Sequence, residues 1–81
     1  MLNKVKEYIN DNEFKMIIFY NRINVVNYIK IITLEDTYIS FLIPNAKLII
    51  KGNNLLLNKL LDNEVLISGT VKTIEVDKDE E

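Results

Sequence analysis

Residues 46–76 read AKLIIKGNNLLLNKLLDNEVLISGTVKTIEV, in which three apolar runs are separated by Gly52-Asn53 and by Asp62-Asn63. Glycine and asparagine tolerate the positive φ angles that tight hairpin turns require. We therefore expect three strands joined by two hairpins, with Gly52 and Asn53 as structural turn residues. The substitution Gly52→Val is expected to destabilise the chain, because β-branched residues resist positive φ.

The last of these runs changes its alternation partway along. Its apolar residues occupy odd positions through Val71 but even positions at Ile74 and Val76. Successive side chains of a strand point to opposite faces, so a bulge or a tight bend must lie between these positions. We place it within residues 69–73, and we assign Gly69 a structural role there.

The upstream half of the chain shows the same succession of apolar runs and turn residues. Turn signals that recur about every 8–12 residues are typical of an all-β sandwich or barrel. The runs are Phe14–Tyr20, Ile23–Leu34 and Thr37–Ile43, and the turns are Asn21-Arg22, Glu35-Asp36 and Pro44-Asn45.

Together these runs predict a mainly β fold, an antiparallel β-meander of six or seven strands that forms a small sandwich or rolled sheet. The 81 residues suffice for one domain. We assign residues 14–76 to the β domain and residues 77–81 to an acidic, disordered tail. Residues 1–13 are expected to form a short amphipathic helix and a connector, since Leu2, Val5, Tyr8 and Ile9 fall at helical spacing.

The composition argues against catalysis and against a bound cofactor or metal. The chain has no cysteine and no histidine, so the usual zinc ligands are missing, as is the base of a nucleophilic triad. Its two glycines are too few for a phosphate-binding loop. We therefore expect a protein that is not an enzyme, with no catalytic, cofactor-binding or metal-binding residues.

Charge and hydropathy suggest where the protein acts. The net charge is −2 and the basic residues are scattered, which disfavours nucleic acid as a partner, because phosphate-binding surfaces cluster their basic side chains. No apolar run approaches the roughly 20 residues of a transmembrane helix. We expect a cytoplasmic protein without a transmembrane segment, whose peripheral membrane contacts, if any, are made through a partner.

Several of the predicted strands are apolar on both faces, which is more apolar surface than one short helix can cover. Either the sheet folds onto itself, or one face docks on another molecule. The sequence therefore predicts a protein partner, or self-association, through an apolar sheet face.

Three segments read KMIIFYNRINVVNY at residues 15–28, LIIKGNNL at residues 48–55 and EVLISGTVKTIE at residues 64–75. In this order they resemble the YabP/YqfC sporulation protein family. That family has an Ile-rich strand, a short turn, an Asn-Tyr or Asn-His step, an L-x-I-x-G-x-x-L segment and a closing I-L-I-x-G-x-I-x-x-I strand. After the Asn-Tyr step, where the family usually has Lys-Gly, this chain has Ile29-Lys30.

The resemblance implies a small non-enzymatic protein of endospore-forming Firmicutes. Such a protein is made during sporulation and acts in spore envelope or coat formation through protein–protein association. Its implied location is the cytoplasm, including the forespore surface. The family has no catalytic residues to carry over to this chain.

The alternative is an Sm-like RNA-binding domain, because residues 48–55 also look like the second Sm motif. In that family Lys51, Gly52 and Asn53 would line an RNA-base pocket. About twenty residues with a strand pattern follow this motif here, whereas the Sm motif lies near the end of its domain. The first Sm motif has no counterpart upstream. A third hypothesis is an unrelated β interaction module.

Overall fold

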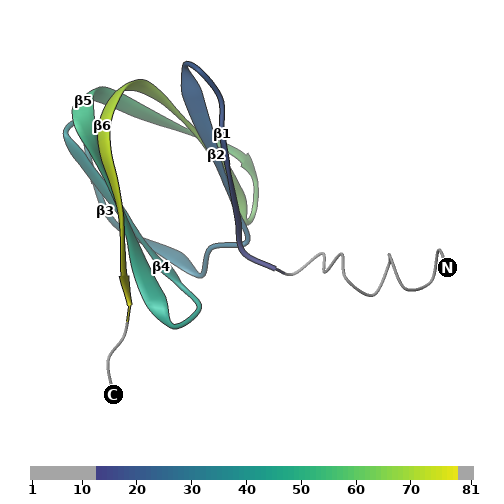
Figure 1. Ribbon diagram of the computed structural model, residues 1–81. Coiled ribbons are helices and arrows are strands. Elements are labelled where there is room, and N and C mark those ends of the chain that lie inside the picture. Colours follow the sequence, from purple (N-terminus) through teal and green to yellow (C-terminus); the bar gives the residue numbers. More distant parts are fainter. Residues whose placement is uncertain (1–12, 79–81) are drawn as a thin grey trace, which may run out of the picture.

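The computed structural model describes residues 13–78, which form a single antiparallel sheet of six strands (Figure 1). An all-β, antiparallel fold is therefore confirmed. The strands are β1 (Lys15–Ile18), β2 (Arg22–Val26), β3 (Lys30–Glu35), β4 (Tyr38–Ile43), β5 (Ala46–Leu61) and β6 (Glu64–Lys78). The amphipathic helix expected in residues 1–13 lies almost wholly outside the described part of the chain.

The sheet has the order β1-β2-β6-β5-β4-β3 and is not closed. Strands β3 to β6 follow one another as a meander, but β2 pairs with β6 and not with β3. A meander through the whole chain is therefore wrong. The cause is the connection after β2, where Asn27 has a positive φ of 63° and the chain leaves the sheet before it re-enters as β3.

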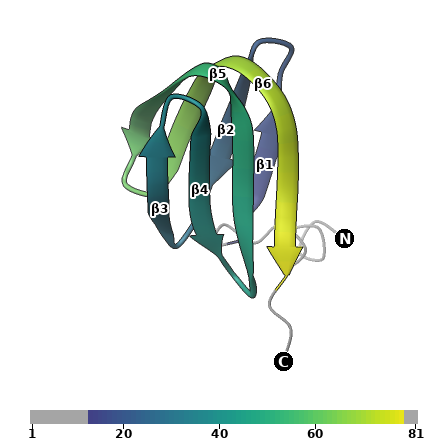
Figure 2. The ribbon, with the colours of Figure 1, turned by 90° about the vertical axis from the view of Figure 1, so that its left-hand side faces the viewer.

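Strands β5 and β6 are long, and both bend sharply near the middle (Figures 1 and 2). The first half of β5 pairs with β4 and with the second half of β6. The second half of β5 pairs with the first half of β6, which in turn pairs with β2. The bent β5–β6 hairpin is thus shared by two arms of the sheet, one with β3 and β4 and the other with β1 and β2.

The core lies between the two arms and is filled by alternate residues of each strand. Ile23 and Val25 of β2 and Val65 and Ile67 of β6 face Phe41 across it, all with 2% exposure or less. The Phe41 ring contacts that of Tyr28, with centroids 5.2 Å apart. The remaining buried members are Ile39, Ile43, Leu48, Ile50 and Leu55.

The local predictions succeed where a turn is made by adjacent residues. Pro44-Asn45 and Asp62-Asn63 form hairpin turns, as expected, and Val65 and Ile67, at odd positions of the last apolar run, are buried. The change of alternation is also confirmed. Lys51 lies opposite Thr73 while Gly52 lies opposite Val71, which leaves Lys72 as an extra residue in β6.

Three boundaries differ from the prediction. The run Ile23–Leu34 is two strands, because the chain turns at Asn27. The expected hairpin at Gly52-Asn53 is absent, since both residues lie inside β5. Asp77 and Lys78, which were expected in the tail, belong to β6, because they pair with Lys47 and Ala46, and the rest of the expected tail lies outside the described residues.

Candidate functional site

The three predicted structural residues meet at the bend of β5 and β6. Gly52 is buried, and a Cβ atom built on it would lie 1.9 Å from the carbonyl oxygen of Thr70. Gly52 does not have a positive φ, so the physical reason given for this position is wrong. Glycine is required there because the backbones of the two bent strands approach closely.

Gly69 is the matching residue on the other strand. Its φ is +112°, and a Cβ atom would lie 2.4 Å from the carbonyl oxygen of Asn54. Asn54 itself has a φ of 54°, so the left-handed backbone expected at Gly52-Asn53 occurs one residue later. Gly52 thus faces the backbone of Thr70, next to Gly69, and Gly69 faces the backbone of Asn54, two residues after Gly52. Because neither glycine has a Cβ atom, the hairpin can bend sharply here.

The bend is tied to the β3–β4 turn by two backbone hydrogen bonds. The amide of Gly52 donates to the carbonyl oxygen of Thr37 (3.1 Å), and the amide of Leu55 donates to that of Asp36 (2.8 Å). Lys51 points outward, where its ammonium lies 3.7 Å from a carboxylate oxygen of Glu75. Lys51, Gly52 and Asn53 therefore lie along a strand, with Gly52 covered by backbone, an arrangement that does not favour a base-binding pocket at this motif.

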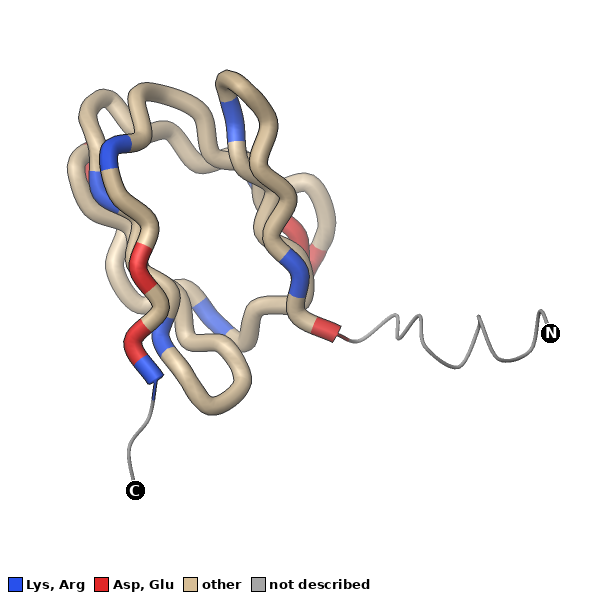
Figure 3. Tube along the Cα trace, in the orientation of Figure 1, with Lys and Arg blue, Asp and Glu red and all other residues tan. Residues whose placement is uncertain are grey.

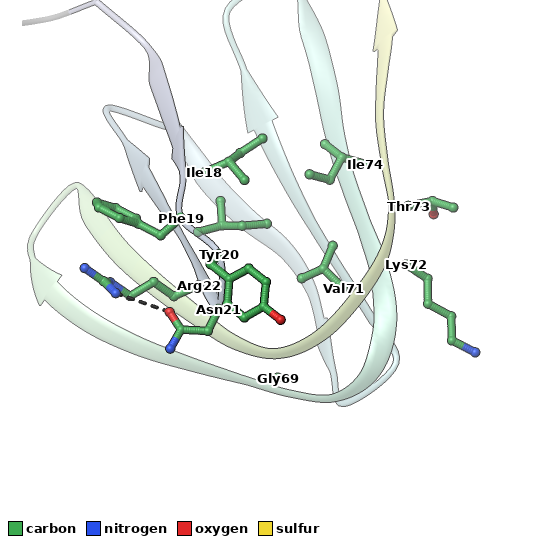
Figure 4. A pocket seen from close by; sticks show the side chains of 11 residues that line it. Ile18, Phe19, Tyr20, Asn21, Arg22, Gly69, Val71, Lys72, Thr73 and Ile74 are labelled. Atoms are coloured by element: carbon green, nitrogen blue, oxygen red, sulfur yellow. Dashed lines mark hydrogen bonds between the residues drawn. The ribbon is translucent and has the colours of Figure 1, made fainter.

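A cleft of about 330 Å³ opens between the β1–β2 hairpin and the second half of β6 (Figure 4). Ile18, Val71 and Ile74 line it with apolar side chains, whereas Lys72 and Thr73 point away from it. The lining residues include two cations and no carboxylate. They are Ile18, Phe19, Tyr20, Asn21, Arg22, Ile23, Gly69, Val71, Lys72, Thr73 and Ile74.

The rim of this cleft is built by the β1–β2 turn. The guanidinium of Arg22 stacks over the Phe19 ring at 3.9 Å and donates a hydrogen bond to Oδ1 of Asn21 (3.3 Å). The amide of Phe19 donates to the carbonyl oxygen of Arg22, which closes the turn (2.8 Å). Tyr20 at the tip is fully exposed. The turn expected at Asn21-Arg22 therefore lies slightly earlier, and Arg22 begins β2.

The outward surface of the arm containing β1 and β2 is largely uncharged, and we call it the neutral face. Pairing across the four strands places Ile17, Asn24, Leu66 and Asn58 in one row. The exposed side chains of Ile17, Leu56 and Leu61 are 45%, 58% and 63% accessible. The outward residues are Lys15, Ile17, Arg22, Asn24, Val26, Leu56, Asn58, Leu61, Glu64, Leu66 and Ser68.

Asn24 lies near the middle of the neutral face and is incompletely satisfied. Its side-chain nitrogen donates to Oε2 of Glu64 at 3.4 Å. Its Oδ1 atom is buried and accepts no hydrogen bond from the described residues. A buried acceptor without a donor costs about 1–3 kcal/mol.

The outward surface of the other arm is different, and we call it the charged face. Cross-strand pairs place Lys47 opposite Asp77 and Lys51 opposite Thr73. Glu75 lies between these rows and contacts Lys51. Alternating charges of this kind are typical of a sheet face exposed to water. Figure 3 shows positive and negative residues close together on this arm.

Sequence reasoning predicted an apolar sheet face but did not identify it. The signal lay in residues 55–61, where leucine occurs on both faces of the strand. Only strand pairing shows that Leu55 and Leu57 point inward while Leu56 and Leu61 point outward. The neutral face also depends on β1 and β2, whose position beside β6 the sequence did not predict.

Between residues 13 and 78, no group of three acidic, histidine or cysteine side chains is placed to hold a metal ion. None of the described residues belongs to a helix long and apolar enough to cross a membrane.

No protein-family model matches this chain, and neither a curated protein nor a solved structure matches it.

Proposed function

We propose that this chain is a non-enzymatic sporulation protein, similar to the YabP/YqfC family, that acts in spore envelope or coat formation by associating with another protein. The neutral face is its docking surface. The observation that carries the association is the contrast between the two outward faces of one sheet. One face carries the Lys51–Glu75 ion pair and Lys47 opposite Asp77, whereas the other exposes Ile17, Leu56 and Leu61.

The sporulation assignment rests on the resemblance in residues 15–28, 48–55 and 64–75. The fold adds a physical link between these segments. The glycines of the second and third segments, Gly52 and Gly69, meet at one bend, and residues 22–26 of the first pair with residues 64–68 of the third. The three segments therefore form one structural unit, as a family motif would.

The docking surface suits a protein partner more than a polyanion. The neutral face carries Lys15 and Arg22 against Glu64, with no cluster of basic side chains. Association through such a face would bury leucine and isoleucine side chains, at about 25 cal/mol per Å² of apolar area. We propose a cytoplasmic location at the forespore surface, with any membrane contact made by the partner.

Imaging of a tagged chain in its own host tests the role. We expect fluorescence to be absent during growth, to appear after starvation and to collect around the forespore. Diffuse fluorescence throughout growth would contradict the proposal, and salt-dependent RNA binding would then be the property to measure.

A matched pair of variants tests the docking surface. Leu56→Gln alters the neutral face and Leu34→Gln alters the edge strand β3, at residues that are 58% and 56% exposed. We expect Leu56→Gln to disperse the forespore signal and Leu34→Gln to leave it in place, with both variants folded by circular dichroism. An equal effect of both substitutions would rule out the neutral face as the docking surface.

A further inference from the structure

The sheet leaves four strand edges unpaired within residues 13–78, and three of them carry features that block further pairing. The edge of β1 is only four residues long. That of β3 is interrupted by a bulge at Ile32 and begins with Lys30. The second half of β5 has a bulge near Leu60, and Lys59 shares the inner face with its partner Val65. Short edges, bulges and inward charges are the usual protections against edge-to-edge association.

The second half of β6 is the exception. Residues 73–78 pair in unbroken register with residues 46–51 of β5 on one side. On the other side no described strand pairs with them, because β2 reaches only as far as Ser68. Figure 2 shows this half of β6 as the outer strand of its arm. Its apolar residue Val76 is 50% exposed.

Charge along this edge is separated by sign. Lys72 stands at its start, and Arg22 lies close by, opposite Ser68. Glu75 and Asp77 follow, and the sequence continues after Lys78 with Asp79, Glu80 and Glu81. Neither Lys72 nor Arg22 forms an ion pair with a described carboxylate. Within the described residues the edge therefore has Lys72 at its beginning and two carboxylates, Glu75 and Asp77, ahead of Lys78 toward its end.

We propose that two copies of this chain form a dimer by antiparallel pairing of their β6 edges. An antiparallel pair brings the start of one strand beside the end of the other, so the basic end of each copy meets the acidic end of its partner. The contact is isologous, and every charge pair occurs twice. With the two Ile74 residues opposite each other and the extra residue Lys72 left unpaired, Asp77 of the second copy lies opposite Thr70, close to Lys72.

The cleft beside β6 receives the apolar side chains of the added strand. In this register Val76 of the second copy lies opposite Val71, with its side chain toward the inner face, where Ile18, Val71 and Ile74 line the cleft. Val76, half exposed in one copy, becomes covered in two. Strand addition of this kind gains affinity from backbone hydrogen bonds and selectivity from alternate side chains. The dimer does not depend on the neutral face.

Charge reversal tests the dimer. Lys72 and Asp77 are exposed, so their substitution preserves the fold. Within one copy they are five residues apart on an extended strand, about 16 Å, which exceeds the screening length of about 8 Å at physiological salt. A coupling between the two positions would therefore arise between copies.

Sedimentation equilibrium at protein concentrations of about 10–100 µM measures the dissociation constant of the dimer. We expect the parent chain to dimerise, and Lys72→Glu or Asp77→Lys alone to raise the dissociation constant about tenfold, because each replaces two attractive pairs by two repulsive ones. The double variant should restore it. Lys30→Glu on the β3 edge, with the same change of charge, should have no effect.

A parent chain that stays monomeric over this range would overturn the proposal. A dimer whose dissociation constant is unchanged by Lys72→Glu would also overturn it. So would a double variant in which the two increases of the dissociation constant add instead of cancelling. Circular dichroism of each variant confirms that the sheet is retained. The forespore experiment uses Leu56, on another strand, so its failure would be distinct from a failure here.

Discussion

Adding one methyl group at the bend, by Gly52→Ala, should strongly destabilise the domain. The new Cβ would lie 1.9 Å from the carbonyl oxygen of Thr70 and 3.0 Å from Cα of Val71. Non-bonded heavy atoms prefer separations of about 3.5 Å, so the two strands would have to part by about 1.5 Å. Both obstacles are backbone atoms, and no side-chain rotation can relieve the contact.

The size of the effect follows from this geometry. Overpacking costs about 1–3 kcal/mol, and we expect about 3 kcal/mol here because parting the strands also weakens the hydrogen bonds across the bend. A domain of this size has a free energy of unfolding of about 4–12 kcal/mol. Each kcal/mol shifts the melting temperature by about 4–8 °C, so the expected decrease is about 12–24 °C.

Thermal unfolding followed by circular dichroism measures this decrease. Asn53→Ala serves as the control, since Asn53 is the exposed next residue of the same strand and its truncation should cost about 0.5 kcal/mol or less. A second substitution, Thr70→Gly, should not rescue Gly52→Ala, because the clash is with the carbonyl group. A melting temperature of Gly52→Ala within about 4 °C of that of the parent, or a restoration of its stability by Thr70→Gly, would refute a backbone clash at this position.

Three further predictions concern the backbone, the core and the charged face. Asn54→Ala should cost about 1 kcal/mol and Asn54→Gly close to nothing, because the φ of 54° is unfavourable for residues with a Cβ other than asparagine or aspartate; equal urea midpoints for the two variants would contradict this. Phe41→Ala should lower the free energy of unfolding by about 3–5 kcal/mol, since the ring is fully buried against Tyr28. A decrease below about 2 kcal/mol in urea unfolding would contradict this, because it would show that the core closes around the missing ring. Glu75→Gln should change the free energy of unfolding by less than about 1 kcal/mol, because both members of its ion pair with Lys51 are about half exposed; a larger loss that disappears in high salt would mean that this pair is stronger than surface pairs usually are.

The sequence predicted that apolar surface would be exposed, but it did not show which part of the sheet exposes it. Leucines on both faces of residues 55–61 indicated a surplus of apolar surface, which the exposed Leu56 and Leu61 now locate. The cleft and the free β6 edge had no sequence signal of their own. Both exist because β2 stops pairing with β6 at Ser68, and the length of a pairing depends on where two distant segments meet.

The sequence by itself determined the features that depend on neighbouring residues. Alternation of apolar and polar side chains defined most of β4 and β6, because each strand presents one face to the core. Pro44-Asn45 and Asp62-Asn63 ended strands, because proline cannot donate to a ladder, Asn45 adopts a positive φ, and aspartate and asparagine side chains favour turns. The extra residue at Lys72 was visible as a change of phase.

Only the tertiary structure decided how these pieces combine. A glycine followed by asparagine reads as a hairpin turn, yet Gly52 continues a strand, because its missing side chain makes room for the backbone of Thr70. Likewise no local pattern pairs β2 with β6, which are separated by three other strands along the chain. Both outcomes depend on which backbones come close in space, and that is set by burial of the whole core at once.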